Sequence, residues 1–167
     1  RFGKVKVGIK NSNSFSNNLQ IFNENIRENE SNDHSIGGNI NTVFENFPNF
    51  EISYQKSFTF YSSVATSNKF INDNFQINMN YDFLKDFIFN LNYDYTKYNN
   101  DTQNNSNTYD DLQASLFYQK EDSPWGFELT ATNIFDTKFK QRNSFSDFLI
   151  TDEKTFVLPR IILLKVS

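Results

Sequence analysis

Few residues in this chain could carry out acid–base, nucleophilic or metal chemistry. The 167 residues include no Cys and one His, so the sequence excludes a thiol nucleophile, a Cys-ligated zinc and a site built from several His side chains. A Ser-His-Asp triad would depend on His34 alone, and His34 lies in a polar stretch where an ordinary surface position is favoured. Phosphate-binding and nucleophile-elbow glycine motifs are absent. We therefore expect no enzymatic activity and no bound cofactor.

Carboxylates are the remaining candidates for catalysis, and they fall in polar segments. A catalytic pair needs two carboxylates whose surroundings push their pKa values apart, and nothing in these segments suggests burial. None of them begins the spacing of a calcium-binding loop. The groupings are Asp110-Asp111, Glu121-Asp122, Asp147 and Asp152-Glu153. Three glycosylation-type sequons begin at Asn29, Asn100 and Asn104, and we attribute them to chance in an Asn-rich chain. The sequence thus predicts no catalytic or metal site.

The composition combines a polar average with many aromatic rings. The net charge is −4 and the isoelectric point is about 5.0, which argues against a nucleic-acid-binding protein. Mean hydropathy is −0.64, yet 17% of the residues are aromatic, and a disordered chain would be poor in aromatics. No run of 18 apolar residues occurs, so no transmembrane helix is expected. The composition favours a fold that separates an aromatic face from a polar one.

The elements that position these side chains follow a period of two. In segment 87–96, apolar or aromatic residues alternate with Asn, Asp and Thr, and only a strand collects such residues on one side. Similar alternation recurs in segments 4–10, 36–41, 50–55, 75–81, 112–119, 127–132 and 159–167. We expect about eight strands of roughly ten residues, the length that a tilted strand needs to cross a bilayer.

Short and long connections alternate between these strands. The short ones are 45–49, 82–86 and 121–124, and the long ones are 18–33, 62–68, 99–107 and 136–158. This alternation is typical of outer-membrane barrels, which have tight periplasmic turns and long extracellular loops. The sequence therefore predicts an all-β fold, an antiparallel transmembrane β-barrel segment. A soluble β-sandwich would also alternate polar and apolar residues, and periodicity alone does not decide between the two.

Two sets of side chains have a different meaning in each fold. Aromatic residues near the expected strand ends would form interfacial girdles in a barrel or pack inside a sandwich. They are Phe83, Phe87, Trp125 and Phe127 beside the short turns, and Tyr95, Tyr98 and Tyr109 beside a long loop. Polar residues of the opposite face would line a hydrated lumen or a solvent-exposed sheet. They include Lys4, Lys6, Glu51, Asp94 and Glu128.

Four motifs carry a family resemblance: 120–125 (KEDSPW), 132–137 (TNIFDT), 143–148 (NSFSDF) and 158–160 (LPR). They resemble the C-terminal barrel of TonB-dependent-receptor-like outer-membrane proteins of Bacteroidetes, in which carboxypeptidase-regulatory-like and plug domains precede a barrel of about 22 strands. The resemblance implies that residues 1–167 are one fragment, roughly the last third of such a barrel. Family barrels usually end in an aromatic residue, whereas this sequence ends Lys165-Val166-Ser167, so we expect a few residues beyond Ser167.

The resemblance also implies a function and partners. It implies a receptor or transporter wall in the bacterial cell outer membrane, with ligand uptake energised through TonB acting on a plug domain of the same parent chain. The implied contacts are outer-membrane lipid and lipopolysaccharide, the plug, a surface lipoprotein or another subunit of an outer-membrane complex, and no nucleic acid. Segments 18–33 and 136–158 are the expected ligand-contacting loops.

Other functions stay open at this point. A non-transporting scaffold or assembly component of a surface complex would have the same wall. A complete eight-stranded barrel and a soluble sandwich or carbohydrate-binding module are further readings of the same pattern. An outer-membrane phospholipase would need a Ser-His pair that only His34 could supply.

Overall fold

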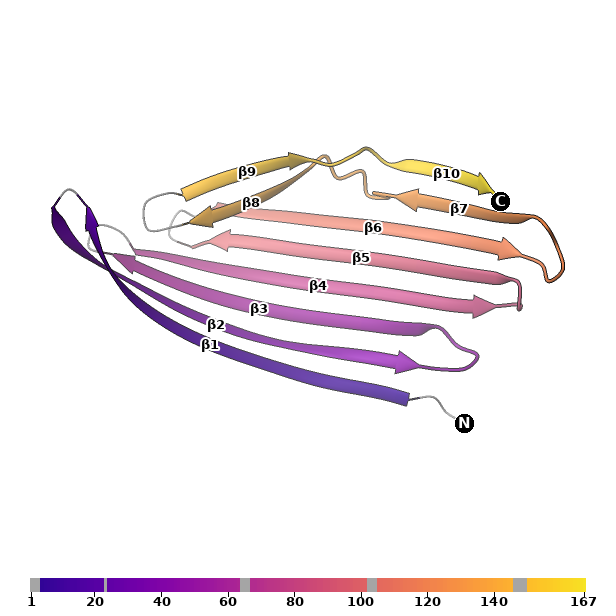
Figure 1. Ribbon diagram of the computed structural model, residues 1–167, viewed down its shortest axis with the longest axis horizontal. Coiled ribbons are helices and arrows are strands. Elements are labelled where there is room, and N and C mark those ends of the chain that lie inside the picture. The colour runs from indigo at the N-terminus through magenta and orange to yellow at the C-terminus, as the bar shows by residue number, and fades with distance from the viewer. Residues whose placement is uncertain (1–3, 23, 64–66, 102–104, 146–149) are drawn as a thin grey trace.

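The computed structural model describes residues 4–22, 24–63, 67–101, 105–145 and 150–167. These ranges contain ten strands and no helix, and eight of the strands form one antiparallel sheet (Figure 1). The sheet order is β1 (Lys4–Phe22), β2 (Asn25–Val43), β3 (Asn49–Ser63), β4 (Ser67–Phe83), β5 (Phe87–Asn100), β6 (Asn105–Gln119), β7 (Gly126–Thr132) and β10 (Ile161–Val166). β8 (Phe139–Phe145) and β9 (Ile150–Phe156) form a second, two-stranded sheet. The all-β, antiparallel prediction is confirmed.

None of the described residues belongs to a helix that is long and apolar enough to cross a membrane.

Every segment with predicted alternation contributes a strand to the large sheet. Each of these strands pairs with the next such segment along the chain, and the last pairing joins β7 to β10 across β8 and β9 in sequence. The short connections form tight turns at one end of the strands (Figure 1). Between β4 and β5, Leu84 and Lys85 both have positive φ (51° and 60°), a left-handed pair that suits the twist of a hairpin. Between β2 and β3, the side chain of Asn49 accepts from the Phe44 N–H at 2.5 Å and closes the turn. We refer to this edge of the sheet as the short-turn end, and to the opposite edge as the distal end.

The prediction of a long loop at 18–33 is wrong. β1 and β2 have 19 residues each, and they pair as far as Phe22 opposite Asn25, so this segment is the tip of a long hairpin. Alternation fails there because Asn, Ser and Glu occupy both faces, yet the backbone ladder needs no apolar face. Most of 62–68 and 99–107 is strand for the same reason. Strands β1 to β6 have 14 to 19 residues, longer than the roughly ten residues expected from the sequence.

The prediction of a loop at 136–158 is also wrong. This segment contains β8 and β9, which follow β7 and precede β10, so that the last hairpin is a pair of long strands broken at one level (Figure 1). Asn133 and Asp136 have positive φ (48° and 57°) and bend the chain at the break. We call residues 133–138 and 157–160 the neck. It separates β8–β9 from the ladder of the large sheet.

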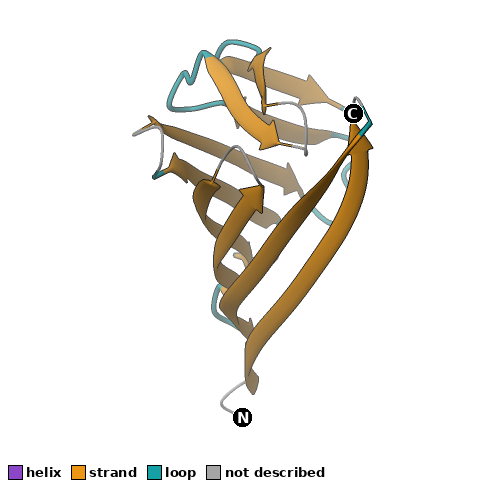
Figure 2. Ribbon diagram, turned by 90° about the vertical axis from the view of Figure 1, so that its left-hand side faces the viewer, coloured by secondary structure: helices purple, strands orange, loops and turns teal. Residues whose placement is uncertain are grey.

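The sheet is open and has almost no core. β1 and β10 are its edges, and they do not pair with each other within the described ranges. The sheet is curved when seen end-on (Figure 2). The buried apolar side chains among the described residues are Tyr61, Phe70 and Tyr98, at the distal end. A sandwich would stack a second sheet on the first at about 10 Å, but the other sheet described here, β8–β9, contacts the large sheet at β6.

Candidate functional surfaces

The cross-strand register gathers the alternate apolar residues of all eight strands on one face of the large sheet. One row across the strands illustrates this, since Val7, Ile40, Ile52, Ile77, Tyr93 and Leu112 are successive register partners from β1 to β6. We call the part of this set that reaches from the short-turn end to Ile36 on β2 the apolar face. It comprises Val5, Val7, Ile9, Ile36, Ile40, Phe50, Ile52, Tyr54, Phe75, Ile77, Met79, Tyr81, Phe83, Phe87, Phe89, Leu91, Tyr93, Tyr95, Leu112, Ala114, Leu116, Tyr118, Phe127, Leu129, Ala131, Ile162, Leu164 and Val166.

No described strand packs over the apolar face, and the neck contacts it at Tyr93, where the Phe135 ring lies edge-on with the centroids 6.1 Å apart. Ile9 is 82% exposed on edge strand β1, and Leu164 is 68% exposed on edge strand β10. Monomeric soluble proteins rarely leave an apolar patch larger than a few hundred Å² in water, and larger patches mark contacts with a membrane or a partner. The apolar face extends across eight strands, so it is a candidate binding surface.

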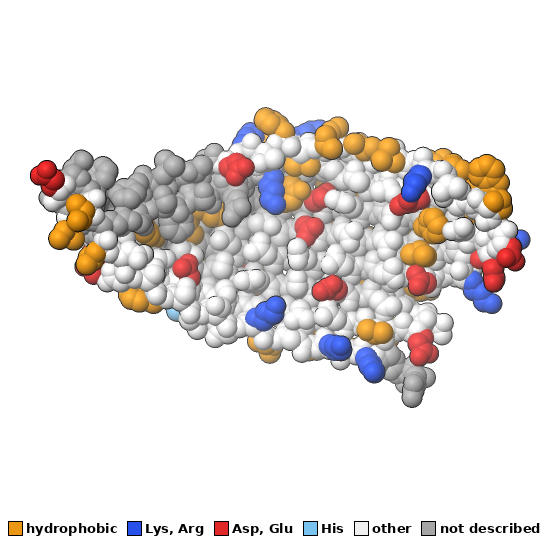
Figure 3. Space-filling model, in the orientation of Figure 1, with side chains coloured by type: hydrophobic (Ala, Val, Ile, Leu, Met, Phe, Trp, Pro, Cys, Tyr) orange, Lys and Arg blue, Asp and Glu red, His pale blue; other side chains and the backbone are white. Residues whose placement is uncertain are grey.

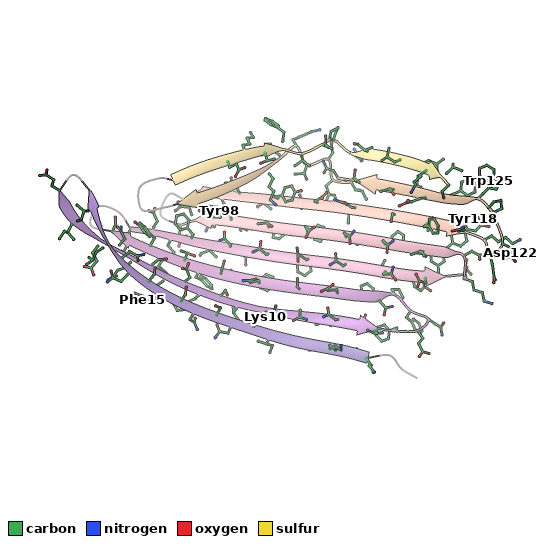
Figure 4. The ribbon with its side chains drawn as sticks, viewed as in Figure 1. Lys10, Phe15, Tyr98, Tyr118, Asp122 and Trp125 are labelled. Atoms are coloured by element: carbon green, nitrogen blue, oxygen red, sulfur yellow. The ribbon has the colours of Figure 1, made fainter. Side chains whose placement is uncertain are left out.

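Aromatic rings form a continuous row across the apolar face at the short-turn end. Successive ring centroids are 5.3 Å apart for Tyr81–Phe83, 5.3 Å for Phe83–Phe87, 4.6 Å for Phe87–Tyr118 and 6.4 Å for Tyr118–Phe127. We call these five residues the aromatic row. Trp125, 61% exposed, lies beside the row in the turn before β7, near Tyr118 in Figure 4. The grouping of Phe83, Phe87, Trp125 and Phe127 expected from the sequence is therefore present at this end.

The grouping expected at the other end is partly wrong. Tyr95 lies on the apolar face, where it is the register partner of Phe75. Tyr98 and Tyr109 lie on the opposite face, because β5 and β6 continue beyond Tyr95 without a break and the period of two carries them there. Tyr98 is buried against Phe70, with ring centroids 5.8 Å apart.

A charged row ends the apolar face on its distal side. Lys56, Asp73 and Lys97 are register partners on β3, β4 and β5, one position beyond the row of Tyr54, Phe75 and Tyr95. The Lys56 ammonium lies 3.2 Å from Oδ1 of Asp73, and the Tyr54 hydroxyl donates to the same oxygen at 2.5 Å. The apolar face thus lies between an aromatic row at the short-turn end and this charged row. Beyond the charged row, the same side of the sheet again carries apolar residues, among them Phe15 on β1 and the register partners Phe58 and Ile71 on β3 and β4.

The opposite face is polar and hydrogen-bonded across the strands, and we call it the polar face. The Gln76 amide donates to Asp94 at 2.7 Å, and the Asn80 amide donates to Asn90 at 2.8 Å. The face seen in Figure 3 carries mostly uncharged polar side chains with scattered charges across its middle. The register places Lys4, Lys6, Glu51, Asp94 and Glu128 on this face together, as the sequence predicted.

A hollow of about 630 Å³ opens on the polar face over β1 to β4. Its depth comes from Gly37, which stands between Lys10 on β1 and Gln55 on β3 in one register row. A Cβ atom on Gly37 would lie 2.7 Å from the Tyr54 carbonyl oxygen, so this position admits only glycine without a backbone shift. The hollow was not predicted from the sequence. A glycine inside a strand, here Gly37, is the signal that could have indicated it.

The Asn-Ile-Phe-Asp-Thr motif of the sequence analysis holds the neck together. Asn133 is 4% exposed, and its amide donates to the carbonyl oxygens of Thr137 at 2.9 Å and Leu158 at 2.8 Å. Its own side-chain oxygen accepts from the Thr137 N–H at 2.8 Å, and the Thr137 hydroxyl donates to the Asp110 carbonyl at 2.8 Å. One buried side chain therefore joins both strands of the last hairpin.

Asp136 adds a charge to the same neck. Its carboxylate accepts from the ammonium of Lys138 at 2.5 Å and from the backbone N–H of Arg160 at 3.4 Å. The hydrogen bond from Lys138, followed by that from Arg160, holds the pKa of Asp136 below its ordinary value.

The polar residues considered for chemistry are not assembled into a reactive site. Nδ1 of His34 lies 2.5 Å from the Asn13 side-chain oxygen, while Asp33, on the other face, accepts from the Thr59 hydroxyl at 2.5 Å. Among the described residues, no three His, Asp or Glu side chains gather as a metal site would require.

The other sequence candidates are dispersed or lie outside the described part. Asp111 accepts from Gln113 at 2.8 Å, and Glu121-Asp122 lie in a turn. Asn29 and Asn100 are buried, which does not suit a sugar acceptor. Asp147, Asn104 and the side chain of Asp152 lie outside the described residues, and Glu153 is the register partner of Arg142 on β8.

No family model, curated protein or solved structure matches this chain.

Proposed function

We propose that this chain is part of the wall of a bacterial outer-membrane β-barrel, belonging to a receptor or transporter. The apolar face contacts lipid acyl chains, and the polar face lines a water-filled interior. The single observation that carries the proposal is the alignment of apolar residues from eight strands on one uncovered face, with a hydrogen-bonded polar face behind it.

The dimensions of the apolar face support this arrangement. On β5 it runs from Phe87 to Tyr95, about 27 Å along the strand at a rise of about 3.4 Å per residue. A strand tilt of about 40° reduces this height to about 21 Å, close to the roughly 25 Å apolar band of outer-membrane barrels. Tyr and Trp prefer the boundary between acyl chains and water, which suits Tyr118 and Trp125 at the short-turn end.

Closure follows from the same physics. Backbone groups exposed to lipid must be paired, so edge strands β1 and β10 would each pair with a further strand of a larger barrel. We place the short-turn end in the periplasm and the long hairpins outside the cell, because outer-membrane barrels have short periplasmic turns and longer extracellular loops. In this proposal residues 1–167 are the C-terminal part of the barrel, and the plug and N-terminal domains lie elsewhere in a longer protein.

The wall carries out no bond chemistry in this account. The tip of the β1–β2 hairpin and the β8–β9 hairpin meet the ligand first, and energy for uptake comes through TonB acting on the plug. Lipopolysaccharide and acyl chains surround the apolar face, and a surface lipoprotein would dock at the distal end.

A gel experiment tests the barrel. The full-length protein, extracted in mild detergent, should migrate differently in SDS before and after boiling, because a closed barrel resists unfolding by SDS. Identical migration of the two samples would contradict the proposal. Transport is tested separately: uptake of the protein's ligand should stop in cells that lack TonB, and unchanged uptake would favour a scaffold.

A further inference from the structure

Charges on the polar face are separated by strand. In β1 to β6, the Lys side chains of this face are Lys4, Lys6 and Lys10, and all three lie on β1. The acidic side chains of the same face lie on the next five strands: Asp33 on β2, Glu51 on β3, Asp82 on β4, Asp94 on β5 and Asp111 on β6. The polar face therefore presents cations along one edge and anions toward its middle, a field that orients a dipolar ligand.

The hollow spans this change of sign. Lys10 and Glu51 both line it, Lys10 from β1 (Figure 4) and Glu51 from β3. Strands are about 4.8 Å apart, so β1 and β3 lie about 10 Å apart across the hollow. In the row of Lys10, no side chain stands between these two strands because the residue on β2 is Gly37. Glu51 lies in the row of Lys6, four residues along the strand from the row of Lys10, so about 14 Å along the strand separates the two rows.

Amide side chains line the hollow beside the two charges. They are Asn39 on β2, Gln55 on β3, and Asn74 and Gln76 on β4. An amide has one carbonyl acceptor and two N–H donors, and Gln76 uses one N–H for Asp94. A peptide bond presents the complementary donor and acceptor, so these amides can pair with a ligand backbone. The aromatic ring of Tyr54 belongs to the apolar face, and the other lining residues are not aromatic, so the hollow lacks the stacking platform that a sugar ring would use.

We propose that this hollow binds a short zwitterionic peptide. The ligand carboxylate contacts Lys10, the ligand ammonium contacts Glu51, and the amide side chains of the hollow pair with the peptide backbone. The site rests on the proposed function in one respect, since the polar face must line an aqueous interior that a ligand can enter. The volume of about 630 Å³ is within the range of small-ligand sites, which suits a peptide of a few residues.

Titration calorimetry on the full-length protein in detergent tests this site, with tetraalanine as the probe. Tetraalanine with free termini should bind, and Lys10→Met and Glu51→Gln should each weaken binding about tenfold through loss of a charge-assisted hydrogen bond. The termini identify the partners: Lys10→Met should not affect binding of the C-terminally amidated peptide, and Glu51→Gln should not affect binding of the N-acetylated one. Lys165→Met is the control, because Lys165 lies on the same face but on β10, outside the hollow.

Three results would overturn the inference. They are equal binding of free and doubly blocked tetraalanine, an equal loss with Lys165→Met, and binding of maltotetraose in place of the peptide. Absence of any binding by a protein that still shows heat-modifiable migration would also overturn it and leave the proposed function standing. A protein whose migration does not change on boiling would instead contradict the barrel itself.

Discussion

The rings of Phe87 and Tyr118 lie 4.6 Å apart, centroid to centroid, across the β5–β6 pair at the short-turn end of the sheet. They are the closest pair in a row of rings that runs from β4 to β7. No described segment packs on this row, so its rings support one another and present their outer surfaces to whatever surrounds the protein.

Coupling between these two rings gives the first prediction. Phe87→Ala and Tyr118→Ala should each destabilise the protein in lipid vesicles, and a double-mutant cycle should give an interaction of about 1 kcal/mol, typical of paired aromatic rings. Denaturant unfolding measures the cycle. Phe47→Ala is the control, because Phe47 lies exposed in the β2–β3 turn. Additive losses at Phe87 and Tyr118 would mean that the rings do not interact.

Charge on the two faces gives the second prediction. Ile77→Lys should cost about 2–4 kcal/mol of stability in a bilayer, because it places an ammonium against acyl chains near the middle of the apolar face. Asn78→Lys, one residue away on the polar face, should change stability by less than about 1 kcal/mol. Unfolding in vesicles compares the pair, and similar losses for both would contradict the assignment of faces.

The neck gives the third prediction. Asn133→Ala removes the three hydrogen bonds of a buried side chain and leaves the Leu158 and Thr137 carbonyls without their donor, at a cost of about 2–4 kcal/mol. Hydrogen exchange should then speed up at the amides of Thr137 and Ile134, while amides in β4 keep their protection. Asn80→Ala is the control, since the Asn80–Asn90 pair is exposed and should contribute less than about 1 kcal/mol. Unchanged exchange in Asn133→Ala would show that another contact joins the strands.

The pH dependence of the neck gives the fourth prediction. The pKa of Asp136 is lowered in the folded protein, so its carboxylate contributes stability at pH values above its ordinary pKa of 3.8 and loses that contribution as the pH falls through the lower, folded value. The protection factor of the Val157 amide, whose N–H donates to the Lys138 carbonyl oxygen, should therefore fall below about pH 4 once the intrinsic pH dependence of exchange is divided out. Asp136→Asn should abolish this fall, and a fall of equal size in that variant would exclude Asp136 as its cause.

The strands were predictable because side-chain period reports which residues share a face. Phe87, Phe89 and Leu91 fix β5 without knowledge of its neighbours, and the register then extends the same face across the sheet. The distal ends were not predictable from period. At the tip of β1–β2 the ladder continues through Asn, Ser and Glu on both faces, and no apolar face marks the strand.

Two features depend on contacts that a period cannot reveal. Asn133 bonds to Leu158, 25 positions away in sequence, and only its motif singled it out. The faces of Tyr98 and Tyr109 follow from how far β5 and β6 continue, which the polar sequence between them conceals. The hollow likewise depends on the row that joins Lys10, Gly37 and Gln55 from three strands.

Fluorescence quenching from within the lipid tests most directly whether the apolar face contacts acyl chains. Trp125 is the sole tryptophan of residues 1–167, so Trp125→Phe, with replacement of any tryptophan elsewhere in the full-length barrel, provides a silent background for a single probe. In that background, Ile77→Trp and Asn78→Trp place the probe at neighbouring residues on opposite faces. In vesicles of lipids brominated on the acyl chains, we predict strong quenching for Ile77→Trp and little for Asn78→Trp, with the reverse order for aqueous iodide. Equal quenching of both variants by the brominated lipid, or of neither, would contradict the account.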